Sequence, residues 1–405
     1  MITRPLYLDK IRPFIDSDQI KILVGIRRAG KSTILSEVAD ILRARGVSEQ
    51  EIAIVNFDTL EYAEIRTRHD FLELAKSLRA AGVRYFFFDE VQLVEHWDEV
   101  LSALYSDKQT DIYISGSNSK LLSSELSTYL TGRYVNTRVH TLNFAEFLDF
   151  AHARGVDYRD TATAFDDFLH RGGFPVVNTT ELTFDECDQI VSDIYASIVL
   201  RDVIERKSIR NVELFSRVVK YVFDNIGNTF SANSVTNFLK NEKRTVAPGT
   251  IYNYLDYLAE AFIIDRVPRY DLRGKAVLKT QEKYYLGDVG LLYAVSGRGG
   301  VQFHLPGILE NIVYHELISH GYEVTIGENA GREIDFIATR RDRTIYLQVA
   351  THLDGAKTIA REFDAFEGLS DDSAERYVLS LDQVTLPIKN SATAKYLPDF
   401  LLNRL

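Results

Sequence analysis

A glycine-containing run at residues 25–32 constrains this chain more than any other feature. Its residues are Gly25, Ile26, Arg27, Arg28, Ala29, Gly30, Lys31 and Ser32. The run fits the pattern G-x-x-x-x-G-K-[ST] at every fixed position, and this pattern is typical of a loop whose backbone N–H groups surround a phosphate. The alternative is an ordinary glycine turn, but such a turn has no structural reason to place Lys and Ser directly after Gly30. The run therefore predicts nucleotide binding.

The segments on either side of the run have the structure that a phosphate loop requires. The apolar residues 20–24 predict a buried strand, and residues 32–42 carry apolar side chains at helical spacing. The positive end of that helix favours a bound phosphate. We expect Lys31 to reach the β- and γ-phosphates of ATP and Ser32 to ligate Mg²⁺. Thr33, in the first helical turn, completes the expected nucleotide site.

A second polar pair follows another apolar run. Residues 83–88 are mostly aromatic or apolar and lead into Asp89 and Glu90, as at the carboxyl end of a central parallel strand. We expect Asp89 to hold Mg²⁺ through water and Glu90 to polarise the water that attacks the γ-phosphate. A solvated acidic turn is the alternative, and the accompanying phosphate loop favours the catalytic interpretation.

A third apolar run, residues 111–116, becomes small and polar at Ser117 and Asn118. Two interpretations remain open: these side chains orient the attacking water or contact the γ-phosphate, or they form a turn that caps the next helix. Residues 52–58 and 135–142 complete a set of five strands with helices between them. The expected fold class is α/β, with a doubly wound parallel sheet.

Composition limits the class of protein. The chain has 405 residues, of which 45% are hydrophobic and 11% aromatic, so we expect a globular protein with several domains. Cys187 is the only cysteine, which excludes an intramolecular disulfide and a four-cysteine metal site. We expect neither a signal segment nor a membrane helix, and therefore a soluble, cytoplasmic protein.

Several short motifs carry a resemblance that covers nearly the whole chain. They are 25–32, Asp89 to Gln92, Ser115 to Ser117, Leu130-Thr131-Gly132-Arg133, Leu142 to Phe147 and Arg171-Gly172-Gly173-Phe174-Pro175. With these motifs the chain resembles bacterial and archaeal AAA-family P-loop ATPases that have a C-terminal domain of unknown function. The resemblance implies an AAA/ASCE-type sheet in which the strand ending at Ser117 lies between the phosphate-loop strand and the Asp89 strand.

The resemblance adds two residues to the expected site. Similar ATPases often place an arginine against the γ-phosphate at the position of Arg133, within one chain or from a neighbouring subunit of a homo-oligomer. An exposed arginine paired with a nearby acid is the alternative. The turn that ends at Pro175 resembles one that packs near the base in related signalling ATPases, and a plain helix-ending turn is its alternative.

The remaining chain divides into three expected parts after an ATPase core at residues 1–150. Residues 151–205 have helical spacing and predict a lid, and residues 206–295 resemble a winged helix, with helices from Ser231 and Pro248 and a wing strand at 262–270.

Residues 201–285 carry fifteen Lys and Arg against ten Asp and Glu, whereas the whole chain has a formal charge of -11. Duplex DNA is therefore expected, if anywhere, at residues 231–280. The candidate phosphate contacts are Lys240, Lys243, Arg244, Arg266, Arg269, Arg273 and Lys275. A packing or oligomerisation role is the alternative, and Asp256 and Glu260 oppose DNA.

Residues 296–405 resemble the restriction-endonuclease-like fold. In that family two acids and a lysine on neighbouring strands bind a divalent metal and activate water, assisted by an acid on the first helix. Glu310 and Asp335 match this pattern and Gln348 replaces the second acid, but Ala350 stands where the lysine belongs. Losing that cation removes water activation and charge stabilisation, so we expect a degenerate nuclease fold. A strand pair with a buried Asp turn is the alternative.

These patterns together predict Mg²⁺-dependent ATP binding and hydrolysis that drives a conformational change in attached DNA- or protein-binding domains. A nucleotide-gated switch with slow hydrolysis is one alternative. An ATP-regulated nuclease is another, which Ala350 disfavours. Guanine specificity is not expected, because the chain lacks an Asn-Lys-x-Asp run.

Overall fold

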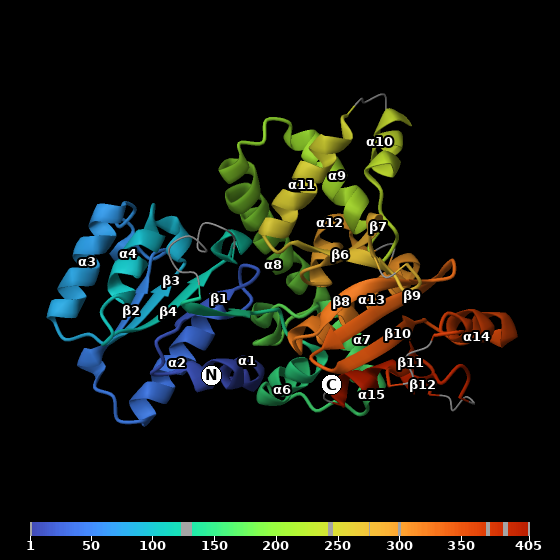
Figure 1. The fold of residues 1–405 in the computed structure, drawn as a ribbon, viewed down its shortest axis with the longest axis horizontal. Coiled ribbons are helices and arrows are strands. Elements are labelled where there is room, and N and C mark those ends of the chain that lie inside the picture. The colour runs from blue at the N-terminus through green and yellow to red at the C-terminus, as the bar shows by residue number, and fades with distance from the viewer. Residues whose placement is uncertain are drawn as a thin grey trace. The chain divides into compact units, whose positions relative to one another are not determined.

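The computed structural model describes residues 2–122, 132–241, 246–274, 276–298, 301–369, 373–383 and 388–403. The chain forms two compact units, Met1–His140 with Glu260–Phe262 and Thr141–Ala259 with Ile263–Leu405 (Figure 1). Three candidate DNA-contact residues and Thr131 lie outside the described ranges; the three are Lys243, Arg244 and Lys275. Leu130, from one of the resemblance motifs, also lies outside them.

A five-stranded parallel sheet forms the centre of the first unit, in the order β2-β3-β4-β1-β5. Its strands are β1 (Ile20–Val24), β2 (Ile52–Asn56), β3 (Tyr85–Asp89), β4 (Asp111–Gly116) and β5 (Tyr134–Arg138). Strands β1, β3 and β4 are buried along their whole length, which explains their nearly continuous apolar runs. The expected parallel sheet is confirmed, and so is the position of β4 between β1 and β3.

Helices and short 3-10 turns precede the first strand or lie between the strands. They are α1 (Pro5–Ile11), η1 (Arg12–Phe14), α2 (Lys31–Ala44), η2 (Glu49–Glu51), η3 (Leu60–Tyr62), α3 (Arg68–Ala80), η4 (Val91–Leu93), α4 (Trp97–Tyr105) and η5 (Ser119–Leu122). Helix α1 packs against α2, and α3 packs against α4 (Figure 1). Phe71 of α3 meets Phe57 and Phe88 edge-to-face, with ring centroids 5.1 and 4.9 Å apart. This aromatic cluster holds α3 against the sheet.

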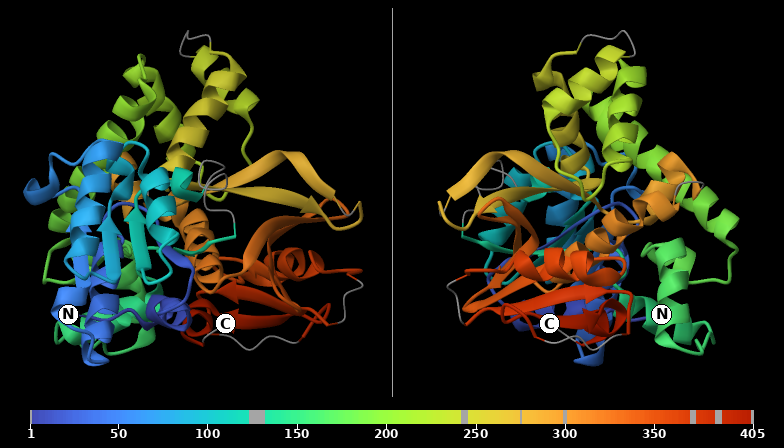
Figure 2. Two further views of the ribbon diagram at one scale, coloured as in Figure 1. Left: turned by 60° about the vertical axis from the view of Figure 1, so that its left-hand side comes forward. Right: turned by 90° about the vertical axis from the view of Figure 1, so that its right-hand side faces the viewer.

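The second unit is built on a seven-stranded sheet in the order β12-β11-β10-β9-β8-β6-β7. Its strands are β6 (Ile264–Asp271), β7 (Ala276–Leu286), β8 (Glu323–Asn329), β9 (Arg332–Arg340), β10 (Arg343–Val349), β11 (Glu375–Ser380) and β12 (Thr393–Tyr396). The expected wing strand is thus part of a larger sheet, because β6 pairs in parallel with β8. Figure 2 shows the yellow β6–β7 hairpin continuing the orange and red strands. The expected boundary at residue 295 therefore falls inside one sheet.

The helices of the second unit precede the sheet in the chain, lie between its strands or follow its last strand. They are α6 (Phe144–Ala153), α7 (Thr161–Arg171), η6 (Pro175–Asn178), α8 (Phe184–Ser197), η7 (Ile198–Glu205, a π-helix), α9 (Val212–Phe223), α10 (Ala232–Asn241), α11 (Pro248–Glu260), α12 (Gly290–Ser296), α13 (Val301–Ser319), α14 (Gly355–Asp364) and α15 (Leu397–Leu402). The helical character expected for residues 151–205 is confirmed, as are the helices near Ser231 and Pro248.

The C-terminal helix α15 packs against α6 and α7, so the two ends of the second unit are joined. The first unit ends at His140 rather than at residue 150, and residue 205 lies inside the second unit. Periodicity reports local structure only and does not reveal this long-range packing. The division into lid, winged helix and nuclease-like fold remains a prediction.

Among the described residues, no helix combines the length and apolar character that crossing a membrane requires.

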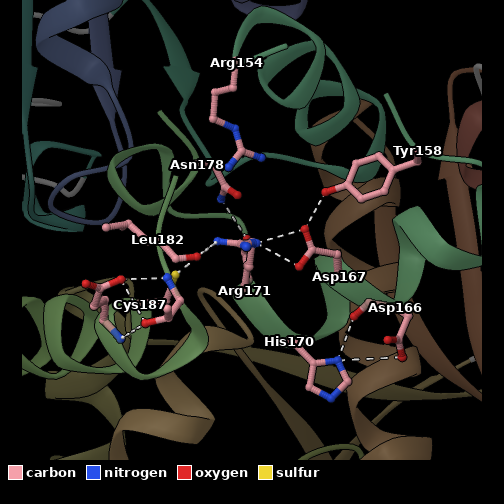
Figure 3. Close-up of polar contacts among 12 residues, drawn as sticks. Arg154, Tyr158, Asp166, Asp167, His170, Arg171, Asn178, Leu182 and Cys187 are labelled. Atoms are coloured by element: carbon pink, nitrogen blue, oxygen red, sulfur yellow. Dashed lines mark hydrogen bonds and ion pairs between the residues drawn. The ribbon is translucent and has the colours of Figure 1, made fainter. Parts of the chain in front are cut away.

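Arg171, the first residue of the glycine–proline motif, is held at the end of α7 by several acceptors. Its guanidinium forms an ion pair with Asp167 at 2.8 Å and donates a hydrogen bond to the carbonyl of Leu182 at 2.9 Å. Figure 3 shows this arginine between Asp167, Leu182 and Cys187. The network fixes the direction in which the chain enters the following glycines.

A buried carboxylate fixes those glycines. Asp288 is 3% exposed, and its two oxygens accept the backbone N–H groups of Gly173 and Gly290, each at 2.8 Å. A Cβ at Gly172 would lie 2.4 Å from Asp288 Oδ1, and its φ of +72° is in the region that favours glycine. The motif that ends at Pro175 thus has a structural partner in the second unit, and Pro175 itself begins η6.

Asp288 gives a testable pH dependence of stability. Burial raises its pKa from 3.8 to about 6, although hydrogen bonds from Thr141, Gly290 and Gly173 oppose the shift. Between these values the folded protein binds a proton that the unfolded chain releases, so the stability from this group is present below pH ~4 and is lost as the pH rises through about 6. A shift of two pKa units corresponds to about 3 kcal/mol.

We expect Asp288→Asn to lack this dependence. From pH 4 to 7, the free energy of unfolding of the wild type should therefore fall relative to that of the variant by about 3 kcal/mol. Urea denaturation followed by circular dichroism at several pH values measures the difference. Parallel pH profiles for the two proteins would show that Asp288 titrates normally.

Candidate nucleotide site

The loop between β1 and α2 has the backbone conformation that the glycine pattern predicts. Gly25 and Gly30 have φ values of +152° and +95°. A Cβ at Gly25 would lie 2.0 Å from the carbonyl oxygen of Val139, so only glycine fits there. Gly30 is the N-cap of α2 and provides no side-chain cap, which leaves the first N–H groups of the helix open to an anionic ligand.

Lys31 folds back over this loop. It is 4% exposed, and its ammonium donates hydrogen bonds to the carbonyls of Gly25 at 2.9 Å and Ile26 at 3.1 Å. Arg4, the residue just before α1, also stabilises the loop, because its guanidinium donates a hydrogen bond to the carbonyl of Ala29 at 2.7 Å. The loop is therefore preformed, with a cation held at its centre.

Four further residues of the expected nucleotide site have different exposures. Ser32 and Thr33 are exposed in the first turn of α2. Arg28 is exposed with a φ of +69°, whereas Arg27 is half-buried and lies 3.6 Å from the carboxylate of Asp58. These side chains surround the loop with cationic and hydroxyl groups, the types that bind phosphate and a magnesium ion.

Asp89 ends β3 and is 3% exposed. Its carboxylate accepts a hydrogen bond from the Asn56 amide at 3.0 Å and others from the hydroxyls of Ser115 and Ser32. Burial raises the pKa of Asp89, and the two serine hydrogen bonds counteract this effect. Asp89 and Ser32 thus bring two hard oxygen donors together, which suits Mg²⁺ bound jointly with a phosphate.

Glu90 follows directly, with a φ of +55° that is costly for a residue with a side chain. It is 9% exposed, and its carboxylate accepts hydrogen bonds from Gln92 and, at 3.1 Å, from Ser117. Burial alone would raise the pKa of Glu90, but the charge of Lys31 and the hydrogen bond from Gln92 outweigh it, so the pKa lies below its usual value. The carboxylate is therefore ionised at neutral pH, as a general base must be.

The structure brings five expected site residues to the carboxyl edge of one sheet: Lys31, Ser32, Asp89, Glu90 and Ser117. Asn118 is buried beside them, and its carbonyl accepts the N–H of Leu121 at 3.2 Å, as the turn interpretation predicts. Sequence reasoning did not assign Asn56, Ser115 or Gln92. Their signal was the same as for the others, a polar residue at or just after the end of an apolar strand.

Arg133 lies elsewhere. Its carbonyl accepts the N–H of Ile20, and it precedes β5, which runs parallel to β1. This is the amino edge of the sheet, about 15 Å along the strands from the phosphate loop at a rise of ~3.3 Å per residue. The guanidinium there lies over the ring of Tyr105, 5.2 Å from its centroid. The structure thus does not bring Arg133 to the nucleotide site of its own chain, and action on a neighbouring subunit stays a prediction.

The residues of the expected nuclease site do meet, within the second unit. Asp335 on β9 donates its N–H to the side-chain oxygen of Gln348 on β10 at 2.7 Å. Lys283 on β7 is 2% exposed, and its ammonium lies 3.0 Å from Glu310 and 3.6 Å from Asp335. It also lies 2.8 Å from Glu333.

A buried cation therefore lies among the residues of the expected nuclease site. Ala350 belongs to an apolar cluster, whereas Lys283 comes from a strand more than sixty residues earlier. A cavity of about 460 Å³ is lined by Glu310, Asp335 and Gln348. Among the described residues, however, no group of three or more His, Cys, Asp or Glu side chains is arranged to hold a metal ion.

The expected DNA-binding residues are partly neutralised by acids of the same unit. Arg266 lies 3.3 Å from Asp256 and 3.5 Å from Glu282, and Arg269 lies 3.6 Å from Glu333. Lys240 and Arg273 are exposed. Along α11 Ile251, Leu255 and Leu258 are buried, and Asp256 lies on the exposed face.

Comparison with known proteins places these features in a family. Residues 17–148 match an AAA domain, and residues 162–302 match a domain of unknown function (DUF8612). An uncharacterized protein of Haemophilus influenzae is 37% identical over 354 residues, which are 86% of this chain and 87% of that protein. An uncharacterized protein of Methanocaldococcus jannaschii is 28% identical over 385 residues, which are 92% of this chain and 82% of that protein.

Among solved structures, that of the Aeropyrum pernix ORC1 protein in complex with DNA is similar to 73% of this chain and 92% of its own, with 13% identity and a TM-score of 0.31. The relationship to the Haemophilus influenzae protein is much closer, since its 37% identity extends over most of both chains. The AAA match covers the sheet and the phosphate loop described above. The chain therefore carries an AAA domain at residues 17–148 and belongs to one family with the Haemophilus influenzae protein.

Proposed function

We propose that the protein binds ATP together with Mg²⁺ and hydrolyses it at the carboxyl edge of the five-stranded sheet. One observation carries the proposal: Glu90, a buried carboxylate whose pKa is lowered mainly by Lys31 against the effect of burial, lies at the same sheet edge as the phosphate loop. A phosphate-binding cation and an ionised base in one site are the two groups that γ-phosphate hydrolysis requires.

Each side chain has a role in this proposal. The N–H groups of the loop and Lys31 hold the phosphates, while Ser32 and Asp89 offer oxygen atoms to Mg²⁺, directly and through water. Magnesium, when bound with ATP, neutralises part of the phosphate charge. Glu90 accepts a proton from the attacking water, and Ser117 hydrogen-bonds Glu90. Arg27 and Arg28 add positive charge at the loop.

The Glu90→Gln variant tests hydrolysis separately from binding. We expect it to bind ATP as the wild type does and to lose about 10²–10⁴-fold in kcat, because an amide cannot act as the base. Phosphate release with and without Mg²⁺ measures turnover, and a fluorescent ATP analogue measures affinity. Glu95→Gln is the matched control, an exposed carboxylate in the same segment. Normal turnover by Glu90→Gln would rule out the assignment of the base.

A nucleotide-gated switch is the second candidate function. It is favoured by the two hydrogen bonds that already occupy Glu90 in this structure. A switch hydrolyses at roughly 10⁻³ s⁻¹ or less without a partner, whereas typical enzymes turn over at about 10 s⁻¹. The steady-state rate of the isolated protein therefore separates the two functions.

The second unit is the part that we propose to be coupled to the nucleotide. Its proposed ligand is duplex DNA at residues 231–280, although the ion pairs of Arg266 and Arg269 leave fewer free cations than the sequence suggested. A gel shift that weakens steeply with salt is expected if DNA binds there.

The nuclease alternative gains support from Lys283, and nicking of supercoiled plasmid with Mg²⁺ or Mn²⁺ tests it.

A further inference from the structure

Gln92 has a place in the site that the proposed function does not yet use. It lies in η4, two residues after Glu90. Its amide nitrogen donates hydrogen bonds to Glu90 Oε2 and, at 3.3 Å, to Ser117 Oγ, and the Ser117 hydroxyl donates to the same Oε2 at 3.1 Å. The three side chains thus form a closed ring of hydrogen bonds.

Both hydrogen bonds to the Glu90 carboxylate end on one oxygen. Oε1 forms no hydrogen bond with any residue in the described part of the chain. A free glutamate side chain has many rotamers, and hydrogen bonds to one carboxylate oxygen reduce the number that it can adopt. The arrangement therefore leaves a single, oriented oxygen available to accept a proton, which is the geometry that general-base catalysis needs.

The chain beside Gln92 leaves room for this contact. A Cβ at Gly116 would lie 1.9 Å from Leu121 Cδ1 and 2.4 Å from Gln92 Oε1, so glycine at this position leaves space for both side chains. Gln92 Oε1 is itself buried without a hydrogen-bond partner among the described residues. An unsatisfied buried acceptor destabilises a fold, so the amide is not placed there for stability. The amide nitrogen of Gln92 is the atom that forms the hydrogen bond to Glu90.

We propose that Gln92, together with Ser117, is a positioning residue that orients Glu90 so that Oε1 acts as the base. The inference rests on the proposed hydrolysis. In that reaction the water oxygen forms a bond to the γ-phosphorus, and the bond to the ADP oxygen breaks with its electron pair remaining on ADP. One proton of the water goes to Glu90 Oε1.

The test uses the full chain and the variant Gln92→Met, which keeps the side-chain volume and removes the donor. We expect kcat to fall about 10- to 100-fold while the affinity for a fluorescent ATP analogue stays within twofold. Gln92→Glu, which when ionised cannot donate and repels Glu90, is expected to lower kcat at least as far. Gln50→Ala, an exposed glutamine of the same unit, is the control that leaves kcat unchanged.

A double-mutant cycle decides whether Gln92 acts through Glu90. In the Glu90→Gln background, single-turnover rates with and without Gln92→Met should agree within twofold, because no base remains to be oriented. An equal loss in both backgrounds overturns the inference, as does a loss of ATP affinity with unchanged kcat. If the melting temperature of Gln92→Met is well below that of the wild type, Gln92→Glu takes its place in the same double-mutant cycle. Normal kcat in both Gln92 variants overturns the inference and leaves the proposed function intact, whereas a wild type without turnover removes the proposed function itself.

Discussion

Replacing Lys31 with alanine is expected to abolish measurable ATP binding. The Lys31 ammonium lies inside the phosphate loop, within 3.1 Å of the carbonyls of Gly25 and Ile26, and it is almost fully buried. Truncating one partner of a buried charge pair costs about 2–5 kcal/mol, which corresponds to a roughly 30- to 5,000-fold loss of affinity. The loop itself should persist, because Gly25, Gly30 and the Arg4 contact to Ala29 do not depend on Lys31.

Titration with a fluorescent ATP analogue measures this loss. Lys76→Ala is the matched control, since Lys76 is an exposed lysine of the same unit that pairs with Glu73. Thermal melting of both variants shows whether the first unit stays folded. Affinity within twofold of the wild type for Lys31→Ala would mean that the loop does not bind phosphate in the proposed way.

The second large effect is expected at Lys283, on stability rather than on binding. Burial alone would lower the pKa of Lys283, but the carboxylates of Glu310, Asp335 and Glu333 raise it above the usual value, so the ammonium stays charged. Lys283→Met leaves these three acids in a buried site without their cation. Breaking a buried ion pair in this way destabilises a protein by about 3–5 kcal/mol.

Urea denaturation at pH 7 measures the change in the free energy of unfolding. Lys357→Met, an exposed lysine of α14, is the control and should change it by less than about 0.5 kcal/mol. Adding Glu310→Gln to Lys283→Met should recover part of the loss, because one of the uncompensated acids becomes neutral. A cost below about 1 kcal/mol for Lys283→Met would show that water or counterions reach this cluster.

The phosphate loop and its neighbours were predictable because their signals are local. The strand expected at residues 20–24 is β1, residue for residue, and the expected helix is α2. Glycine has conformations that other residues avoid, so its spacing around Lys31 and Ser32 specifies a backbone path directly. The acidic pair was predictable for a similar reason, since a buried parallel strand must deliver its last side chains to the sheet edge.

The hydrogen bonds of the site depended on tertiary structure. Nothing local shows that Gln92 turns back onto Glu90, because this contact needs a positive φ at Glu90 and the space left by Gly116. The place of Arg133 was also undetermined. A strand's direction in the sheet decides which edge its flanking residues reach, and a position just before β5 is at the edge opposite to the nucleotide site.

The amino-acid sequence by itself determined the local features of this protein: the phosphate loop, the apolar strands and the acidic ends that follow them. Only the tertiary structure decided that β6 and β7 join the sheet of the C-terminal part, and that the ammonium of Lys283 lies beside Glu310 and Asp335. The physical reason is that backbone preference and hydrophobic periodicity act over a few residues. Ion pairs and strand pairing instead join residues that are distant in the chain, and their energy depends on the burial that the whole fold creates.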